Sequence, residues 1–575
     1  MNNNEELTSK SNTMEDNAPQ KSLEKMIDAY LKLHPEISGA HYQSRKVPEL
    51  EVRFGTGKGI GAPPFTKVDY DMVVQALYSS NFVPEKEKGE ALLRIQNEYF
   101  DKKTNRTKIS NIRAEIVGMD LVQEYCRTNS IQKLIDLTSS ANAKTSKIKF
   151  TQKLPANPDL KILDFPDMGF RVSFQFENYF RPNEDISRKI IQEWKNSKKV
   201  FRYLNRVRFS HPDIPIFVDI SIVKRSKTTN FVPVPQYSIQ DSGVFENQET
   251  YEIELEMDNM RVEKFTKDEL IGHIRNMIRL VMGALQQTKY PIGLKEVKDG
   301  IKDYMYLIHH HFNKDHTMDN ATDEMSKEDI GALLDRRDSN LILPKYFIGP
   351  SSYTLQLDNI VSTEQASKTN VPNIRSNFTV TDKADGERRL LFINSIGRIY
   401  MIRTNMQMIF TGMVAKITNE NRDKIVNTLI DGEFISYDKT GQPLNLYMAF
   451  DIYFLGGKSV RKEGFYPITV EDRLKGNFRF LYLEKFVRET LNMEPVVANR
   501  AASNQCGFSM DIKNFYVAME GDQIFEACGM ILAKEKSGTF IYNTDGLIFT
   551  PALMGVGADR IGVAGKMRKE TWEYS

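Results

Sequence analysis

Lys383 stands in the stretch TVTDKADGER just after a β-branched run, and it is followed closely by Asp385, Gly386 and Arg388. A lysine amine has a reference pKa of about 10.4 and is inert while protonated, so a nucleophilic lysine must be desolvated or lie near another cation. A solvated turn is the alternative interpretation of so short a pattern. The stretch therefore raises the hypothesis of a lysine whose amine attacks an α-phosphate.

Three acidic segments further along the chain could complete such a site. They are DGEF at 431–434, YMAFDIYF at 447–454 and DGLIFTP at 545–551. Each places an acidic residue beside a strand-like apolar run, so the carboxylates could converge on one pocket. We expect Arg388 to contact phosphate or ribose and Glu433 to meet the sugar hydroxyls. Asp545 would serve a metal that neutralises phosphate charge, and Phe450 would stack on a base.

A second set of charges lies in the N-terminal half, where many short segments alternate between charged and apolar residues. A strand over ELEVRFG puts Glu49, Glu51 and Arg53 on one face, and YEIELEMD does the same for its own glutamates. The remaining members are Glu252, Glu254 and Glu256, Arg113 with Glu115, Arg206 with Arg208, and Asp219. For any single strand, a half-exposed sheet facing water is the alternative.

The order of these charges favours a closed barrel. The acidic pairs lie on the first and last strands of the β-rich region, and the basic ones lie between them. Because a closed barrel brings its first and last strands together, the carboxylates would line one tunnel beside arginines and lysines. Oxygen ligands would hold Mg²⁺ or Mn²⁺ there, and the basic strands would hold a polyphosphate. The apolar faces would point outward, under helices.

Composition sets the wider limits. With 575 residues and 40% apolar content, the chain can form two to four domains. A net charge of +2 gives no global field toward nucleic acid or membrane, and three cysteines are too few for a disulfide framework. No apolar run reaches the roughly 18 residues of a membrane span, so we expect a soluble intracellular protein without membrane contact.

Polarity and periodicity divide the chain into four parts. They are a disordered tail over 1–20, a β-rich domain with helices over 21–300, a linker over 301–345 and an α/β region over 346–575. His309, His310, His311 and His316 fall in the linker. Consecutive histidines cannot share one face of a regular element, so we prefer a solvated linker to a metal site.

The first constellation resembles the RNA triphosphatases of the triphosphate tunnel metalloenzyme family. In that family, glutamates of the first strand and of a late ExE strand bind the metal that activates water toward the γ-phosphate. The resemblance implies Glu49, Glu51, Glu254 and Glu256 as metal ligands, although Glu252 competes for this role. It also implies Arg113, Arg206, Arg208 and Lys224 as phosphate binders, with Glu115 and Asp219 in support.

The second constellation, as KADGER, DGEF, MAFDIYF and DGLIF, resembles the covalent nucleotidyltransferases, which include ATP-dependent ligases and capping guanylyltransferases. The DGLIF form and the N-terminal tunnel favour the multifunctional mRNA capping enzymes of large nucleocytoplasmic DNA viruses. The resemblance implies GTP and 5′-triphosphate RNA as substrates and a lysyl-GMP at Lys383. It further implies viral transcription machinery as a partner, and host cytoplasm (the virus factory) or the virion as location.

The expected fold class is α+β, with an N-terminal antiparallel β-barrel tunnel under covering helices, followed by an α/β, ligase-like nucleotidyltransferase domain. The family continues past DGLIF into a lysine-bearing strand, an OB-fold and a methyltransferase, whereas this sequence stops at RKETWEYS. We therefore expect a fragment whose triphosphatase is complete and whose guanylyltransfer is weakened or absent. An ATP-dependent ligase, a phosphatase of nucleotides or polyphosphate, and a non-catalytic RNA-binding scaffold remain the alternatives.

Overall fold

The computed structural model describes residues 18–33, 46–55, 64–138, 147–156, 160, 162–230, 232–310, 328–330, 344–366, 372–496, 507–518, 523–556 and 572–574. The chain forms two compact units, Met1–Gln286 and Gln287–Ser575, which are described separately. The predicted tail therefore lies outside the described residues as far as residue 17. In the described part of the chain, no helix is both long and apolar enough to span a membrane.

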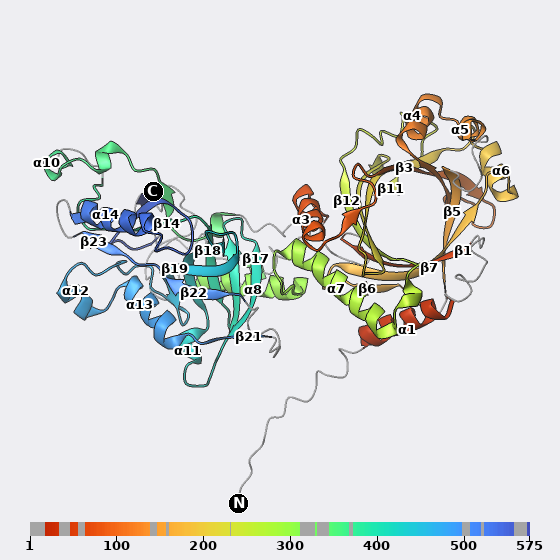
Figure 1. Ribbon diagram of the computed structural model, residues 1–575. Helices are drawn as coiled ribbons and strands as arrows, with labels where there is room; N and C mark the ends of the chain where they lie inside the picture. The colour runs from red at the N-terminus through yellow and green to blue at the C-terminus, as the bar shows by residue number, and fades with distance from the viewer. Residues whose placement is uncertain are drawn as a thin grey trace, which may run out of the picture. The chain divides into compact units, whose positions relative to one another are not determined.

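Eight strands of the described part of the first unit close into an antiparallel barrel (Figure 1). In order around the ring they are β1 (Lys46–Phe54), β12 (Thr250–Met257), β9 (Ile216–Arg225), β8 (Lys199–Ser210), β3 (Glu90–Asp101), β4 (Arg106–Val117), β5 (Ile148–Pro155) and β7 (Phe170–Phe180). The pairing of β1 with both β12 and β7 closes the ring. The predicted meeting of the first and last acidic strands is thus confirmed.

Helices cover the outside of the barrel on two sides (Figure 1). The first unit contains α1 (Ala18–Leu33), α3 (Lys67–Ser79), α4 (Met119–Thr128), α5 (Ile131–Thr138), α6 (Asp185–Gln192) and α7 (Lys267–Gln286), and the short strands β2 (Val83–Pro84), β6 (Leu163–Phe165), β10 (Thr228–Thr229) and β11 (Val232–Pro233). Alternate residues such as Leu50, Val52 and Leu255 pack outward against α1 and α7. The charged residues between them must then face the interior.

The second unit is built on two sheets. The smaller has the order β13 (Ser351–Tyr353), β25 (Trp572–Tyr574), β24 (Thr544–Pro551), β14 (Phe378–Ala384) and β23 (Tyr516–Ala518). The larger has the order β20 (Lys458–Ser459), β19 (Pro443–Leu455), β18 (Thr428–Tyr437), β15 (Glu387–Ile393), β16 (Arg398–Arg403), β17 (Met408–Ala415) and β21 (Met493–Pro495), and β22 (Ser509–Ile512) pairs with β19. The turn between β14 and β15 joins the two sheets.

The described part of the second unit also contains α-helices. They are α8 (Leu294–His310), α10 (Thr363–Ala366), α11 (Arg422–Ile425), α12 (Val470–Lys475), α13 (Arg479–Lys485) and α14 (Gln523–Lys536). One face of the larger sheet packs on α8 and the other on α13, while α14 packs on the smaller sheet. With a barrel in one unit and covered sheets in the other, the α+β fold class is confirmed.

The predicted linker over 301–345 differs from the structure at its start. Residues 301–310 belong to α8, whose Tyr304, Leu307 and Ile308 are buried in the core of the second unit. Their helical spacing is the physical reason, because it places three apolar side chains on one face. His309 is also buried and its ring packs edge-on against Tyr346. His311 and His316 lie outside the described residues.

Candidate active sites

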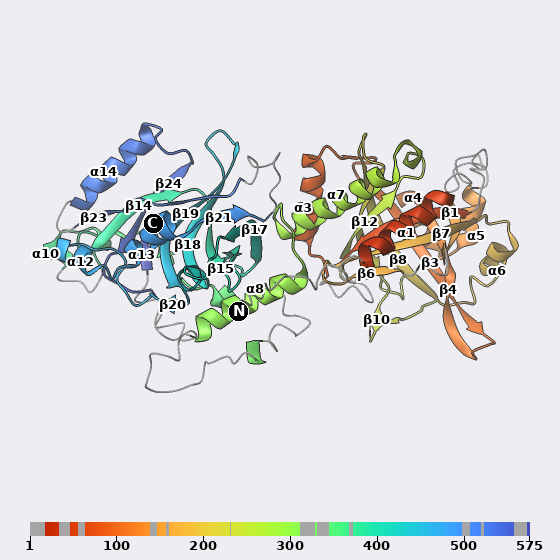
Figure 2. The same cartoon turned by 90° about the horizontal axis from the view of Figure 1, so that it is seen from below.

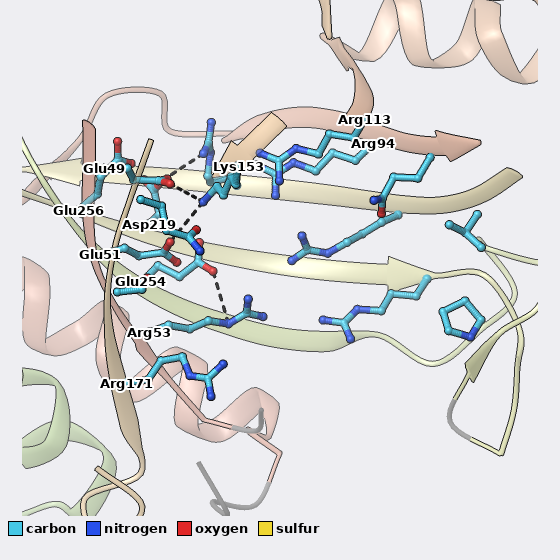
Figure 3. Close-up of a pocket in the computed structure, with 18 of the residues that line it drawn as sticks. Glu49, Glu51, Arg53, Arg94, Arg113, Lys153, Arg171, Asp219, Glu254 and Glu256 are labelled. Carbon is cyan, nitrogen blue, oxygen red and sulfur yellow. Dashed lines mark hydrogen bonds and ion pairs between the residues drawn. The ribbon is translucent and has the colours of Figure 1, made fainter. Parts of the chain in front are cut away.

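The interior of the barrel is a charged cavity of about 590 Å³. Figure 3 shows Glu49, Glu51, Glu254, Glu256 and Asp219 gathered on one side of it, with Arg94 and Arg113 pointing toward them. The strand register produces this gathering: Glu51 lies opposite Glu256 and Arg53 lies opposite Glu254. Glu51 and Glu256 carry like charges and repel each other, so bringing them together costs free energy.

The buried carboxylates fall into two classes by their cation partners. Three arginines pair with Glu252, namely Arg53 at 2.9 Å, Arg225 at 2.5 Å and Arg202. Burial works against the ionised form, but these arginines outweigh it and lower the pKa of Glu252 to about 2. Glu115 forms ion pairs in the same way with Arg94 at 2.9 Å and Arg113 at 2.7 Å, and these arginines outweigh its burial and lower its pKa.

Glu254 belongs to the other class. Burial first, and then the charges of Glu51 and Glu252, raise the pKa of Glu254 to about 7, although Arg53 lies 3.6 Å away. The pKa values of Glu49 and Glu256 are raised as well, chiefly by burial. These carboxylates have too little compensating positive charge for their degree of burial, unlike Glu252 and Glu115.

A divalent cation would supply the missing charge. Among the residues that the structure describes, no three His, Cys, Asp or Glu side chains are already arranged as metal ligands. Lys153 lies between two of the candidates instead, with its Nζ 2.5 Å from Glu49 and 3.3 Å from Glu51. A cluster of carboxylate oxygens with raised pKa values fits a hard cation such as Mg²⁺ or Mn²⁺.

Most of the predicted phosphate binders point into the barrel. Arg113 and Arg206 line the cavity, and Arg206 also reaches Asp219 at 3.2 Å. Arg208 holds Asp219 at 2.7 Å and contacts Glu256. Asp219 is 2% exposed and lies opposite Glu254 on the neighbouring strand. Its position suits the supporting role that the sequence suggested.

Lys224 is the exception, and its prediction as a phosphate binder is wrong. It is five residues from Asp219 on the uninterrupted strand β9, so alternation places it on the opposite, outer face. Its Nζ donates to the carbonyl oxygen of Phe245 at 3.0 Å. The next residue, Arg225, has the inward orientation and lines the cavity.

Sequence reasoning also missed several cations of the tunnel. Those that line the cavity are Arg94, Lys153, Arg171, Arg202 and Arg225. Lys153 could have been found, because it alternates with Lys149 and Thr151 in KIKFTQKL. The same alternation is expected of a strand whose polar face meets water. Only the closure of the barrel shows that this polar face lines the tunnel.

The lysine site of the second unit is built around a β-bulge. The pairing of β14 with β24 shifts between Asp382 and Ala384, where Lys383 alone lies opposite two residues of β24, Asp545 and Gly546. The extra residue of this bulge is therefore on β24, next to Asp545. The Nζ of Lys383 lies 2.8 Å from Asp545 on β24, and 36% of the Lys383 side chain is exposed. The amine is therefore held by one carboxylate and remains reachable.

Neighbouring strands bring further predicted residues to the larger sheet. Arg388 and Glu433 face each other directly across β15 and β18. Arg388 pairs with the fully buried Asp431 at 2.5 Å, and its guanidinium carbon lies 5.8 Å from the centre of the Phe450 ring. Asp431, which the sequence analysis left without a role, thus fixes the orientation of Arg388.

The turn from β14 to β15 explains the glycine of the opening motif. A Cβ atom on Gly386 would lie 2.8 Å from both the Glu433 side chain and the Phe434 carbonyl oxygen. Only glycine allows so close an approach without displacement of the strand. The neighbouring Asp385 is exposed, and its backbone N–H donates to Asn543. The turn therefore sets the separation between Lys383 and Glu433.

Glu433 is itself perturbed. Burial first, and then the charges of Asp431 and Glu387, raise the pKa of Glu433 to about 7, while Lys513 and Arg388 oppose this rise. The effect of Lys513 shows that its ammonium group lies close to the site. Sequence reasoning missed Lys513 altogether.

Lys513 is 3% exposed and its Nζ donates to the Asp382 carbonyl at 2.6 Å. It also lies 3.2 Å from the Asp382 carboxylate, which accepts a hydrogen bond from Tyr542 at 3.0 Å. Asp382 immediately precedes Lys383, so these contacts hold the β14 backbone next to Lys383 in place. Because Lys513 and Asp382 lie far apart in the sequence, no local pattern around Lys513 predicts its burial.

Comparison with known proteins finds a family match within the second unit. Residues 365–558 match the family model of the mRNA capping enzyme, catalytic domain. A probable mRNA-capping enzyme of Acanthamoeba polyphaga mimivirus is 34% identical over 120 residues, covering 19% of this chain and 9% of the relative. The chain thus matches less than a tenth of that relative's length.

Solved structures show a more distant likeness. The triclinic structure of the mimivirus capping enzyme triphosphatase is 16% identical and covers 45% of this chain and 96% of its own, with a TM-score of 0.28. The RNA triphosphatase Pct1 of S. pombe is 12% identical, covers 45% of this chain and 91% of its own, and has a TM-score of 0.24. The matched segment, residues 365–558, contains Lys383 and every residue of its site named above, so this part of the chain is similar to the catalytic domain of mRNA capping enzymes.

Proposed function

We propose that this chain acts in mRNA 5′ capping. The barrel removes the γ-phosphate of a 5′-triphosphate RNA end, and the second unit transfers GMP from GTP to the resulting diphosphate end. The observation that carries this proposal is the match of residues 365–558 to the capping enzyme catalytic domain, a segment in which Lys383 lies opposite a bulge of β24 and pairs with Asp545. The carboxylate and arginine tunnel in the other unit supports the first step.

In the barrel step, a water oxygen attacks the γ-phosphorus and the bond from that phosphorus to the β–γ bridging oxygen breaks. Inorganic phosphate and a diphosphate RNA end are the products. Arg113, Arg206 and Lys153 would bind the phosphate oxygens, since charge-assisted hydrogen bonds suit such anions. Asp219 and Glu115 would orient these cations.

Glu49, Glu51, Glu254 and Glu256 would hold the divalent ion, Mg²⁺ or Mn²⁺, which when bound polarises the phosphate and lowers the pKa of water. The difference between the two carboxylate classes favours Glu254 and Glu256 over Glu252, because the arginines already neutralise Glu252. Lys153 would have to leave Glu49 and Glu51 when the ion arrives, which would free its ammonium group for phosphate.

In the second step, the Nζ of Lys383 attacks the α-phosphorus of GTP. A nitrogen–phosphorus bond forms, the bond to the α–β bridging oxygen breaks, and pyrophosphate leaves. The terminal oxygen of the diphosphate RNA end then attacks the same phosphorus and releases Lys383. Before attack, the amine must lose its proton, and Asp545 at 2.8 Å holds and orients it.

The remaining residues would position the nucleotide. Arg388, fixed by Asp431, would bind phosphate or ribose, and Phe450 would stack on the base. Glu433 would accept hydrogen bonds from the sugar hydroxyls, and Asp385 with Gly386 would shape the turn beside them. The viral relative further suggests partners in viral transcription machinery, and either the host cytoplasm or the virion as location.

The test is incubation of the chain with Mg²⁺ and α-labelled GTP or ATP, followed by denaturation. Label retained from GTP supports capping, whereas label from ATP alone would indicate a ligase-type adenylyltransferase. A parallel assay measures phosphate release from γ-labelled 5′-triphosphate RNA, GTP and inorganic triphosphate. Release from the small compounds but not from RNA would contradict the first step and indicate a nucleotide or polyphosphate phosphatase.

A further inference from the structure

Strands β3 and β4 run beyond the barrel wall as a hairpin, here called the tip hairpin and defined as residues 97–109. Its pairing runs from Glu98 opposite Ile109 to Asp101 opposite Arg106. Figure 2 shows it projecting past the same end of the barrel as β10. The pairing shifts between Gln96 and Glu98, where the Gln96 side chain donates to the Ser110 carbonyl at 2.7 Å. An irregular, braced pairing thus marks the place where the hairpin leaves the barrel.

The tip hairpin exposes aromatic and basic side chains together. Tyr99 and Phe100 are 48% and 58% exposed, and Ile109 is 37% exposed. Four cations accompany them, Lys102, Lys103, Arg106 and Lys108, against the two carboxylates of Glu98 and Asp101. All four cations are exposed, and Lys108 pairs with Asp101 at 2.6 Å. Exposed aromatic rings beside an excess of cations are the combination that binds single-stranded nucleic acid.

The tip hairpin is continuous with the tunnel. Gln96 lines the cavity, and strand alternation places Phe100 on the same face of β3 as Gln96. On the neighbouring strands at this end, Val200 and Arg225 also line the cavity, followed along the chain by Pro233 of β11. A polymer whose terminus lies among the tunnel arginines could leave the barrel at the opening beside the hairpin. It would then pass over Phe100.

We infer that the tip hairpin binds the single-stranded RNA that follows the 5′ end held in the tunnel. Bases would stack on Tyr99 and Phe100, and Lys102, Lys103 and Arg106 would contact the backbone phosphates. This inference rests on the proposed function of the barrel and extends it to substrate preference. A free nucleoside triphosphate has no further nucleotides that could reach the tip hairpin, so the hairpin favours RNA ends over nucleotides.

The first experiment measures binding alone. Fluorescence anisotropy of the full chain with a 5′-hydroxyl single-stranded RNA of about 20 nucleotides needs no triphosphatase activity. We expect the double variant Tyr99→Ala/Phe100→Ala to raise the Kd about tenfold. The double variant Lys102→Glu/Lys103→Glu should also lower the slope of log Kd against log salt, by about 0.7 for each RNA phosphate that the variant no longer neutralises.

The matched control lies at the opposite end of β3. Lys86→Glu/Lys88→Glu makes the same change of charge on the exposed turn before Glu90 and should leave the Kd unchanged. An equal loss of affinity in this control, or no loss in either hairpin variant, would overturn the inference.

A second experiment separates this inference from the proposed function. The ratio of kcat/KM for 5′-triphosphate RNA to kcat/KM for inorganic triphosphate should fall about tenfold in Tyr99→Ala/Phe100→Ala. An unchanged ratio would contradict the role of the hairpin while leaving the triphosphatase proposal intact. Failure of the wild-type chain to hydrolyse any triphosphate would contradict the proposed function, and the anisotropy result would still decide the hairpin's role.

Discussion

The barrel tunnel and the lysine site arrange their charges in opposite ways. In the tunnel several buried charges share networks of partners, as Glu252 does with Arg53, Arg202 and Arg225. In the lysine site the reactive amine has one carboxylate partner and stays 36% exposed. Residues in one charge network couple strongly, so a substitution in the tunnel alters several neighbours at once. A change at Lys383 removes the one atom that would form the bond.

Lys383→Ala should have the largest effect of the substitutions that test this difference between the two sites. We expect it to abolish the lysyl-nucleotide adduct, because it removes the amine that would form the bond to phosphorus. Phosphate release by the barrel should not change. Label retained after denaturation measures the first effect, and γ-phosphate release from RNA measures the second.

The matched control for that experiment is Lys383→Arg, which keeps a cation beside Asp545 but has no usable nucleophile. It should also form no adduct while preserving the thermal stability that the ion pair gives. Adduct formation by either variant would show that the label sits on a different residue.

Glu254→Gln should have the next largest effect. The amide keeps the size of the side chain but removes a charge that we propose as a metal ligand, so γ-phosphate release should fall by a factor of at least about 100. Stability in the absence of metal should rise, since the ionised form of Glu254 is opposed by burial and by Glu51. The measurement pairs phosphate release with thermal unfolding.

Glu252→Gln provides the contrast within the same strand. Here the three arginines would lose their shared partner, so the chain should become less stable rather than more. Equal responses of the two variants would contradict the division of the carboxylates into two classes.

Lys513→Met should have a smaller effect on the lysine site. It removes the ammonium that holds the Asp382 carbonyl and carboxylate, so the β14 backbone at Lys383 loses part of its support. We expect the rate of adduct formation to fall about tenfold with little change in the KM for GTP, because positioning is lost rather than binding. Single-turnover labelling gives both quantities.

The exposed Lys534 on α14, which donates to Tyr516, supplies the control as Lys534→Met. A rise in KM without a change in rate for Lys513→Met would indicate that Lys513 binds the nucleotide directly.

Alternation of charged and apolar residues predicted much of the tunnel. It placed Glu49, Glu51 and Arg53 on one face, and the clustering of acids on the outer strands predicted barrel closure. The same rule, applied from Asp219, would have turned Lys224 outward. The error at Lys224 therefore came from the expected role and not from a missing signal. The helical spacing of Tyr304, Leu307 and Ile308 was likewise present in the sequence.

Other features had no local signal. The bulge opposite Lys383 depends on the pairing of β14 with β24, more than 150 residues away along the chain. Lys513 and Arg94 are held by Asp382 and Glu115, and a lone basic residue is more often solvated than buried. Burial of a cation is decided by long-range partners, which a single sequence does not reveal.

Glu433→Gln compares the two units on the same physical property, the pKa of a buried glutamate. Folding raises the pKa of Glu433 from 4.5 to about 7, so between these pH values the folded chain binds a proton that the unfolded chain has lost. This contribution to stability is complete below about pH 4.5 and is lost as the pH rises to about 7. Glutamine cannot titrate, so the variant should gain stability over the wild type across that interval, by at most about 3 kcal/mol. Calorimetric melting of the full chain between pH 5 and 8 measures the difference in Tm, and Glu494→Gln on the exposed end of β21 is the control.

Because burial is the largest cause of the pKa shift for both Glu433 and Glu254, the two glutamine variants should show the same sign of pH dependence without metal. Mg²⁺ should reduce the effect only for Glu254, and an equal response of Glu433 to Mg²⁺ would contradict the separate roles proposed for the two units.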